Sequence, residues 1–348
     1  MKSKSDLDKN DLQILIENFR EKQVKEDSIK KLVIAWNEKG YKPEELKGLA
    51  DIIFELCPQI DLSSNLQAPS SIVDICGTGG DRANTFNIST LAAIVASACG
   101  AKVIKHSGRS TTSISGSVDV LNEFGFNMEL MELNEGLREY TFQKTGLMFV
   151  SSRTLRELFG EVKRICKKIN LPGFINLLGP LVNPYHTDCQ LLGVSSLKWG
   201  KLMAEILRLQ GKKEAIVVCS SVDETGIFLD EFSLSGNNIV WHLNNGNISE
   251  RQIKARDLGL PKVDFRDITV KDKIENKEIC ENILKGKLSE SPYRAKADTV
   301  SLNSGAALYL QKKVKSISDG YYVALKAIHD GLVWEHFQKF LNCNKMKS

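Results

Sequence analysis

Residues 71–106 read SIVDICGTGGDRANTFNISTLAAIVASACGAKVIKH. The apolar residues 71–76 predict a strand, and the glycine-rich residues 77–81 predict a tight loop. Residues 90–100 then predict a helix that leads into a second strand at 101–106. Because strand, helix and strand in this order are typical of a parallel sheet, the segment predicts an α/β fold.

The same alternation continues beyond residue 106. We predict further strands and helices from short apolar runs and helical spacing, with strands at 147–151, 189–195 and 214–220 and helices at 117–126, 198–211, 305–314 and 320–341. Residues 11–57 instead show helical spacing throughout, and the polar, turn-rich residues 59–71 indicate a boundary.

These patterns predict a small all-helical domain and a large α/β domain with a mainly parallel central sheet. We assign residues 1–65 to the helical domain and residues 71–152 and 176–348 to the α/β domain. The charged residues 153–172 predict one more helix, and we expect the segment 153–175 to pack on the helical domain.

Composition narrows the class of protein. A chain of 348 residues with 42% hydrophobic residues is able to bury a large core, and a net charge of +4 is too small to indicate a nucleic-acid partner. The longest apolar run, at 90–104, is shorter than the roughly 20 residues that a membrane span needs, and the first residues lack the apolar segment of a signal peptide. Eight cysteines without a CxxC pair favour reduced thiols, so we expect a cytoplasmic protein.

The loop at 77–81 has the properties of a phosphate site. Glycines permit positive φ and let backbone amides approach a ligand, while the start of the following helix favours an anion. We expect Ser89 or Thr90 to cap that helix. Neither GxGxxG nor GKS/T is present, and a tight turn with solvated polar residues is the alternative, and the more common one for a lone GTGG.

A second polar loop follows the strand at 101–106. It carries Lys105, His106 and Arg109 among serines and threonines, which suits a further phosphate. The alternatives are solvated surface charges for the lysine and arginine and a structural role for the histidine. Because the carboxyl ends of parallel strands meet at one edge of the sheet, the two loops together predict a ligand with several phosphates.

Seven motifs then make a family resemblance apparent: GTGGD, TFNIST, KHxxRS, GSxDxLxxFG, INLLGPLVNP, LDEFS and LNSGAALYL, in this order. From about residue 28 to 340 the chain resembles the anthranilate phosphoribosyltransferases. The resemblance implies a pentosyltransferase of tryptophan biosynthesis, which joins phosphoribosyl pyrophosphate (PRPP) to the amino group of anthranilate and releases pyrophosphate. It also implies the fold of the nucleoside phosphorylase and phosphoribosyltransferase type, Mg²⁺ as cofactor, and a homodimer formed through the helical domain.

The resemblance assigns the donor PRPP to residues of both loops. These are Gly77, Thr78, Gly79, Gly80, Asp81, Thr85, Asn87, Ile88, Ser89, Thr90, Lys105, Arg109, Ser113 and Ser117. It implies Ser89, Asp230 and Glu231 as magnesium ligands, and such hard oxygen ligands suit Mg²⁺. Without the motif, two adjacent carboxylates would more often belong to a solvated loop; the nearby Asp223–Glu224 pair lacks the flanking Leu and Phe-Ser.

The acceptor half departs from the family pattern. The resemblance implies that His106 and the next loop residues contact the acceptor, but KHSGR replaces the usual KHGNR, so Gly108 stands where an asparagine is expected. The stretch FVSSRTLRE at 149–157 also lacks the family's proline and histidine. A paralogous phosphoribosyltransferase with another aromatic or nitrogenous acceptor is therefore an alternative. We assign no residue as a general acid or base.

The arginine that grips the acceptor's carboxylate in the family has no certain counterpart. Counting back from Asn176 gives Cys166, whereas counting forward from Phe149 gives Arg164. We take Arg164 as the candidate, with three alternatives left open: Lys163, Lys167 or no replacement. The basic residues 163–168 also raise the alternative of a non-catalytic, nucleic-acid-binding relative, although a solvated helix face explains them more simply, and we expect no nucleic-acid partner.

Overall fold

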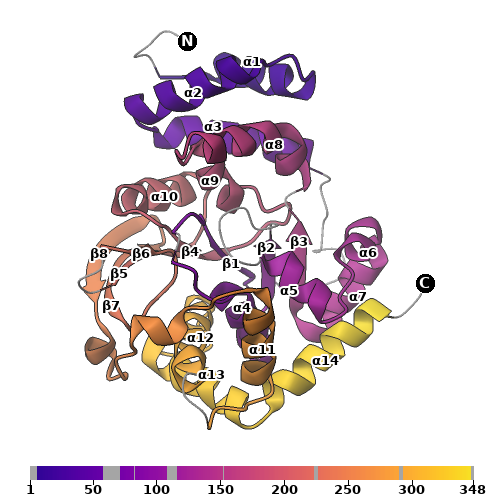
Figure 1. The fold of residues 1–348 in the computed structure, drawn as a ribbon, viewed down its shortest axis with the longest axis vertical. Coiled ribbons are helices and arrows are strands. Elements are labelled where there is room, and N and C mark those ends of the chain that lie inside the picture. The colour runs from indigo at the N-terminus through magenta and orange to yellow at the C-terminus, as the bar shows by residue number, and fades with distance from the viewer. Residues whose placement is uncertain are drawn as a thin grey trace.

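The computed structural model describes most of the chain: residues 6–57, 71–81, 83–107, 116–151, 153–222, 226–289 and 293–345. A single eight-stranded sheet has helices on both of its faces (Figure 1). The predicted α/β fold class is therefore confirmed.

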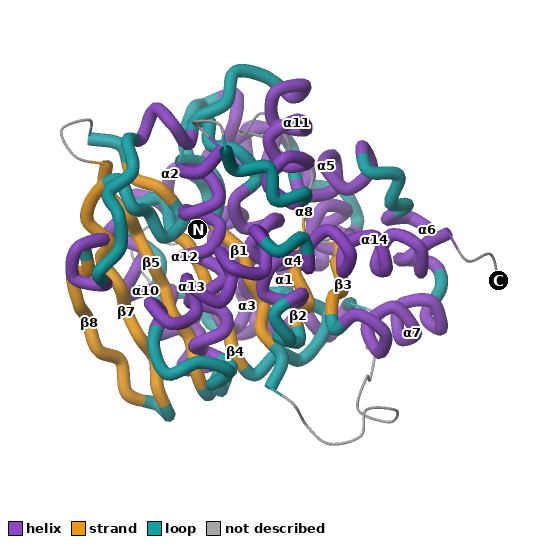
Figure 2. Tube along the Cα trace, turned by 90° about the horizontal axis from the view of Figure 1, so that it is seen from below, coloured by secondary structure: helices purple, strands orange, loops and turns teal. Residues whose placement is uncertain are grey.

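The sheet contains every strand predicted from the sequence and three more. The strands are β1 (Val73–Gly77), β2 (Val103–Ser107), β3 (Leu147–Ser151), β4 (Cys189–Gly193), β5 (Glu214–Val222), β6 (Phe228–Leu229), β7 (Gly236–Asn244) and β8 (Asn247–Ile253). Their order is β3-β2-β1-β4-β5-β7-β8, with β6 paired to β5, and Figure 2 shows β8 and β3 toward opposite edges. The strands β1 to β5 pair in parallel, whereas β6, β7 and β8 are antiparallel additions.

Helices cover each face of the sheet. On one face lie α1 (Lys9–Arg20), α2 (Glu26–Lys39), α3 (Pro43–Leu56), α8 (Arg153–Lys168), α9 (Phe174–Leu178) and α10 (Leu197–Leu209). The others are α4 (Ile88–Ala98), α5 (Ser117–Glu123), α6 (Met128–Leu133), α7 (Glu135–Thr145), α11 (Lys273–Leu284), α12 (Tyr293–Leu310), α13 (Ile317–His329) and α14 (Leu332–Lys345). None of the helices in the described part of the chain is long and apolar enough to cross a membrane.

The period-2 alternation of the strands divides the core into layers. In β1, Val73 and Ile75 belong to the cluster packed around α4 and α12, whereas Cys76 faces the helices of the other side. Helix α4 is apolar all round and buried between the sheet and α12, which explains its unbroken LAAIVA sequence. Both faces of the parallel strands are buried, as is usual for α/β proteins.

Helix α8 lies beside the N-terminal helices, although more than 90 residues separate it from α3 in the chain (Figure 1). The ring of Phe159 is 4.9 Å from that of Phe19 and 5.5 Å from that of Phe174. Burial of these aromatic rings holds α8 against α1 and α9. The division of the chain into two domains stays a prediction, since residues 58–70 lie outside the described ranges.

Candidate functional site

A cleft of about 540 Å³ opens at the carboxyl ends of β1 and β2. It adjoins the pair β1 and β4, from which the strand order runs outward in opposite directions, toward β3 and toward β5, and such a switch point is the usual ligand site of a doubly wound sheet. The walls come from residues 77–81, 85–89, 105–107, 116–117, 155–167, 175–180 and 230–231. The two predicted loops thus meet at one cleft.

The glycine loop is shaped by backbone conformation and by close packing. Gly79 and Gly80 have φ values of +67° and +85°, which favour glycine. At Gly77 an added Cβ would overlap the carboxylate of Asp230, 2.9 Å from its Cγ. A Cβ added at Gly193, at the end of β4, would likewise overlap the backbone of Asp230. Glycine is therefore needed at these positions so that residue 230 can approach the loop.

Side chains that sequence reasoning missed hold the glycine loop in place. The hydroxyl of Ser195 donates to the carbonyl of Gly79 (2.9 Å), and the amide of Asn176 donates to the carbonyl of Thr78 (3.4 Å). The backbone N–H of Thr78 donates to the carbonyl of Gly193 (2.9 Å). These bonds tie the loop to β4 and α9, which leaves part of the loop free to face the cleft.

The start of α4 differs from the prediction. The N-cap is Asn87, so the expectation of Ser89 or Thr90 at this position is wrong. The physical reason is that both hydroxyls are engaged elsewhere. Ser89 Oγ accepts from the ammonium of Lys105 (3.0 Å), and Thr90 donates to the hydroxyl of Ser117 (2.8 Å). Thr90 is fully buried behind Ser117, whereas Ser89, Lys105 and Ser117 line the cleft.

The end of β2 is fixed by a buried carboxylate. Asp74 accepts from the backbone N–H of His106 and from the amide of Asn183, each at 3.0 Å. Burial lowers the pKa of His106, and the charge of Asp74 opposes that shift. The ammonium of Lys105 donates to the carbonyl of Ile75 (2.6 Å), so its charge is held under the cleft floor.

The pair Asp230–Glu231 lies opposite the glycine loop. The N–H of Gly79 donates to Asp230 Oδ2 (2.6 Å). Burial raises the pKa of both carboxyls; the charge of Asp230 raises that of Glu231 further, while Lys105 opposes both shifts. Two carboxylates buried side by side with one nearby ammonium have excess negative charge, which a divalent cation would balance.

The remaining predicted donor residues fall into two groups. Asp81, Thr85, Asn87 and Ile88 line the cleft, and the N–H of Asn87 donates to a partner that was missed, Asn276 Oδ1 on α11 (3.3 Å). Arg109 and Ser113 lie outside the described residues, as do Gly108 of the predicted acceptor site and the pair Asp223–Glu224.

Helix α8 brings basic side chains to the far wall of the cleft: Arg156, Lys163, Arg164 and Lys167. The guanidinium of Arg164 is paired with Glu26 (3.0 Å) and Glu161 (2.8 Å). Cys166 points into the helical core instead, where its Sγ packs against Gly173.

Arg156 and Lys163 differ from Arg164, because neither has an ion pair within the described part of the chain. Burial lowers the pKa of Lys163, and the charge of Arg156 lowers it further. Arg156 was missed from the sequence, although it follows closely on the end of strand β3. Two neighbouring cations without anionic partners indicate a place for a carboxylate.

The chain matches a protein-family model. The model described as "Glycosyl transferase family, a/b domain" matches residues 69–333. The anthranilate phosphoribosyltransferase of Lactococcus lactis subsp. cremoris (strain SK11) is 34% identical over 330 residues, which is 95% of this chain and 93% of that protein. The enzyme of that name from Chloroherpeton thalassium is 32% identical over 332 residues, covering 95% and 92% of the two chains.

Solved structures of anthranilate phosphoribosyltransferases are also similar to this chain. The crystal structure of anthranilate phosphoribosyltransferase from Thermus thermophilus has a TM-score of 0.83 at 25% identity and covers 98% of this chain and 97% of that one. The Saccharomyces cerevisiae enzyme in complex with PRPP and Mg has a TM-score of 0.82 at 25% identity and covers 97% and 92%.

Proposed function

The chain belongs to the anthranilate phosphoribosyltransferase family, and on that premise we propose that it transfers the phosphoribosyl group of PRPP to the amino group of anthranilate and releases pyrophosphate. The single observation that carries the proposal is the buried pair Asp230–Glu231, hydrogen-bonded to the glycine loop at the switch point of the sheet. This arrangement suits a metal-bound polyphosphate.

The donor's phosphates are bound by backbone amides and by the hydroxyl-rich start of α4. Gly80 carries no side chain, and the nearest atoms to a Cβ built there, 3.7 Å and 3.9 Å away, belong to Asn176 and Ser195. A phosphate therefore has open access to the loop backbone, where the dipole of α4 favours its charge. Ser117 and Lys105 provide donors from the second loop.

The residues around Asp230 fit a magnesium ion. Ser89, Asp230 and Glu231 supply hard oxygen atoms. Burial raises the pKa of both carboxyls, and the charge of Asp230 adds to the rise at Glu231, so a cation bound there would stabilise their charged forms. When bound, Mg²⁺ would neutralise pyrophosphate as a leaving group. Asp230 also orients the loop through Gly79, so the metal ligand and the phosphate-binding backbone are coupled.

The chemistry is a substitution at C1 of the ribose. The C1–O bond to pyrophosphate breaks, the C1–N bond to the acceptor forms, and the amine loses one proton to water or to the departing pyrophosphate. Since the transition state resembles an oxocarbenium ion and an aromatic amine is already a competent nucleophile, we assign the protein positioning and electrostatic roles and no general base.

Arg156 and Lys163 take the place of the arginine that the family uses for the acceptor's carboxylate. Their lack of an anionic partner in the described structure supports this role, whereas the two ion pairs of Arg164 disfavour it. Lysine binds as a point charge and arginine as a planar fork, so we assign the more directional contact to Arg156.

The basic stretch 163–168 gives little support to a nucleic-acid-binding function. Arg164 and Lys168 both pair with Glu26, at 3.0 Å and 2.6 Å, and Cys166 lies in the core. The charges of Arg164 and Lys168 are therefore largely neutralised. We further propose a cytoplasmic homodimer that associates through the helical domain.

One assay tests the proposed function. The protein is incubated with PRPP, Mg²⁺ and a panel of aromatic and nitrogenous acceptors, and pyrophosphate release is measured. We expect release with anthranilate and none with EDTA. Release with another acceptor only would favour the paralogue that Gly108 suggests, and no release with any acceptor would contradict the enzymatic proposal.

A further inference from the structure

The proposed magnesium ligands lie on a segment that has no regular secondary structure. Residues 230–235 follow the short strand β6 and precede β7. Phe232 and Ser233 of this segment are completely buried. Because buried peptide groups without hydrogen-bond partners destabilise a protein, and neither a helix nor a strand supplies partners here, side chains have to supply them.

Helix α12 supplies the first of these side chains. Asn303 Oδ1 accepts from the backbone N–H of Phe232 (3.0 Å), and its Nδ2 donates to the carbonyl of the same residue (2.9 Å). Nδ2 also donates to the carbonyl of Thr299, one turn earlier in the helix (2.9 Å). Asn303 is completely buried, so one amide group fixes the residue next to Glu231 relative to α12.

The neighbouring peptide groups are held in a similar way. Asn238 on β7 accepts from the N–H of Ser233 (2.8 Å) and donates to its carbonyl (2.9 Å). The hydroxyl of Ser220 on β5 donates toward the carbonyl of Glu231 (2.5 Å) and toward Asn238 Oδ1 (2.6 Å). Three buried side chains from three elements therefore bind three consecutive residues directly after Asp230.

Helix α12 also contacts the helix that carries the third proposed ligand, Ser89. The hydroxyl of Ser304, next to Asn303, donates toward the carbonyl of Ala92 on α4 (3.3 Å) and toward that of Val300 (2.8 Å). Adjacent residues of α12 thus bind the backbone of both segments that form the metal site.

We propose that Asn303, Asn238 and Ser220 are positioning residues of the metal site. They hold the backbone of Asp230 and Glu231 so that both carboxylates are in place before Mg²⁺ binds. Two adjacent carboxylates repel each other, and Mg²⁺ tolerates little deviation from octahedral geometry, so a fixed backbone favours binding. This role rests on the proposed function, because it requires Mg²⁺ and PRPP as ligands.

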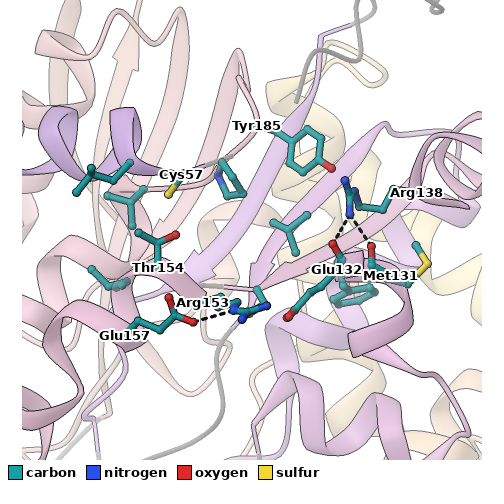
Figure 3. Close-up of a pocket in the computed structure, with 15 residues that line it drawn as sticks. Cys57, Met131, Glu132, Arg138, Arg153, Thr154, Glu157 and Tyr185 are labelled. Atoms are coloured by element: carbon teal, nitrogen blue, oxygen red, sulfur yellow. Dashed lines mark hydrogen bonds and ion pairs between the residues drawn. The ribbon is translucent and has the colours of Figure 1, made fainter. Parts of the chain in front are cut away.

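The acceptor half is held by a separate set of hydrogen bonds. Beside the cavity between β3 and α8, Arg138 Nη1 donates to the carbonyls of Met131 (2.8 Å) and Glu132 (2.6 Å) (Figure 3). Asn303, Asn238 and Ser220 are not among the described residues that line this cavity. Changes at Asn303 should therefore leave KM for anthranilate, at saturating Mg²⁺ and PRPP, within twofold.

The test measures how much Mg²⁺ the full chain needs to bind PRPP. Asn303→Leu removes both hydrogen bonds to Phe232 and keeps a side chain of similar size. Titration calorimetry of PRPP at a series of Mg²⁺ concentrations gives the concentration for half-maximal affinity, and we expect about a tenfold increase or more. Ser220→Ala, which removes one hydroxyl only, should shift this concentration in the same direction and tests the proposal even if Asn303→Leu does not fold.

Asn344 on α14 provides a matched control. It is 3% exposed, and it binds the backbone of Asn127 with the same two hydrogen bonds, from N–H to Oδ1 (2.6 Å) and from Nδ2 to the carbonyl (3.1 Å). Neither residue is among the described residues that line the donor cleft. Asn344→Leu should lower thermal stability about as much as Asn303→Leu and leave the Mg²⁺ requirement within twofold. An equal shift in both variants would overturn the proposal.

Hydrogen exchange of the metal-free protein gives a readout that does not depend on activity. We expect the amide of Phe232 to exchange slowly in the wild type and about tenfold faster or more in Asn303→Leu, because its acceptor is lost. Unchanged exchange at Phe232, or an unchanged Mg²⁺ requirement in Asn303→Leu, would overturn the positioning role alone. A wild type without magnesium-dependent PRPP binding would contradict the proposed function, and the positioning role with it.

Discussion

Replacement of Gly193 by alanine should disable the active site from a position that touches no substrate. Gly193 ends β4, and a Cβ built on it lies 1.5 Å from the carbonyl oxygen of Asp230. The obstacle is backbone, which does not swing aside as a flexible side chain does. To reach a tolerable contact of 3.0 Å, the chain at Asp230 has to move by about 1.5 Å.

That displacement affects the reaction in two ways. Asp230 Oδ2 would lose its bond to the N–H of Gly79, and the proposed magnesium ligand would leave its position. Misplacement by about 1 Å costs on the order of 100-fold in rate, so we expect kcat/KM for PRPP to fall by about 100-fold or more. Overpacking should lower the free energy of unfolding by about 1–3 kcal/mol, so the variant should still fold.

The assay is steady-state pyrophosphate release, with circular dichroism and thermal unfolding of the same samples. Gly136→Ala is the matched control, since the nearest atom to its added Cβ is Asn134 Oδ1 at an ordinary 3.7 Å and it lies in helix α7, far from the donor loop in the chain. Its activity should equal that of the wild type. A folded Gly193→Ala variant within twofold of wild-type kcat/KM would refute the described approach of Asp230 to β4.

Three further predictions concern the loop, the acceptor and pH. Gly80→Val should weaken PRPP binding about tenfold or more with unchanged circular dichroism, because φ is +85° there; undiminished affinity in calorimetry would exclude the phosphate-loop role. Arg156→Gln and Lys163→Gln should each raise KM for anthranilate about tenfold and leave KM for PRPP unchanged, whereas Arg164→Gln should change neither; the reverse pattern in initial-rate kinetics would restore Arg164 as the carboxylate ligand. The pKa of Glu231 is raised to about 8, so the folded metal-free protein holds a proton that the unfolded chain releases above about pH 4.5. The stability that the protonated Glu231 contributes is thus full below pH 4.5 and is lost as pH rises toward 8. Thermal unfolding of Glu231→Gln should not show this loss, and a pH profile identical to that of the wild type would refute the burial of Glu231.

The main strands were predictable because their sequences carry a local signal. Each of β1 to β5 is a short, largely apolar run followed by a loop, because parallel strands are buried on both faces; the few polar residues in them, such as Asp74 and Lys105, are buried as well. The antiparallel β7 and β8 were missed, although Asn245–Gly246 between them is a strong hairpin signal. The φ values of Asn245 and Gly246, +46° and +85°, fit such a turn. The polar sequence of β8 concealed it, since this edge strand is largely exposed.

The donor half of the site was largely predictable from motifs, and its supporting contacts were not. Gly193 ends β4 and Ser195 follows it, about 115 residues beyond the glycine loop that they contact. Asn276 meets Asn87 across 189 residues. Only the parallel pairing of β1 with β4 and the packing of α11 bring these residues together, and no local pattern encodes such contacts.

On the acceptor side, counting from two landmarks gave two positions, because this chain is two residues longer than the family pattern between them. The count also says nothing of where a side chain points. Helix α8 is kinked at Phe159, where φ is −121°, so positions before and after the kink do not follow one helical repeat. Arg156 precedes the kink and Lys163 follows it, yet both line the cleft. Direction along a bent helix, rather than spacing, decides which cations face the cleft.

The most direct test of the central claim is titration calorimetry of PRPP against the wild type and the double variant Asp230→Asn, Glu231→Gln. Both replacements keep the shape of the side chain and remove only charge, and because burial already disfavours that charge, the metal-free variant should be at least as stable as the wild type. We predict that the wild type binds PRPP with Mg²⁺ and loses this affinity in EDTA, and that the double variant shows no magnesium-dependent binding. Equal PRPP affinity of the two proteins in Mg²⁺ would contradict the assignment of this carboxylate pair as the metal site.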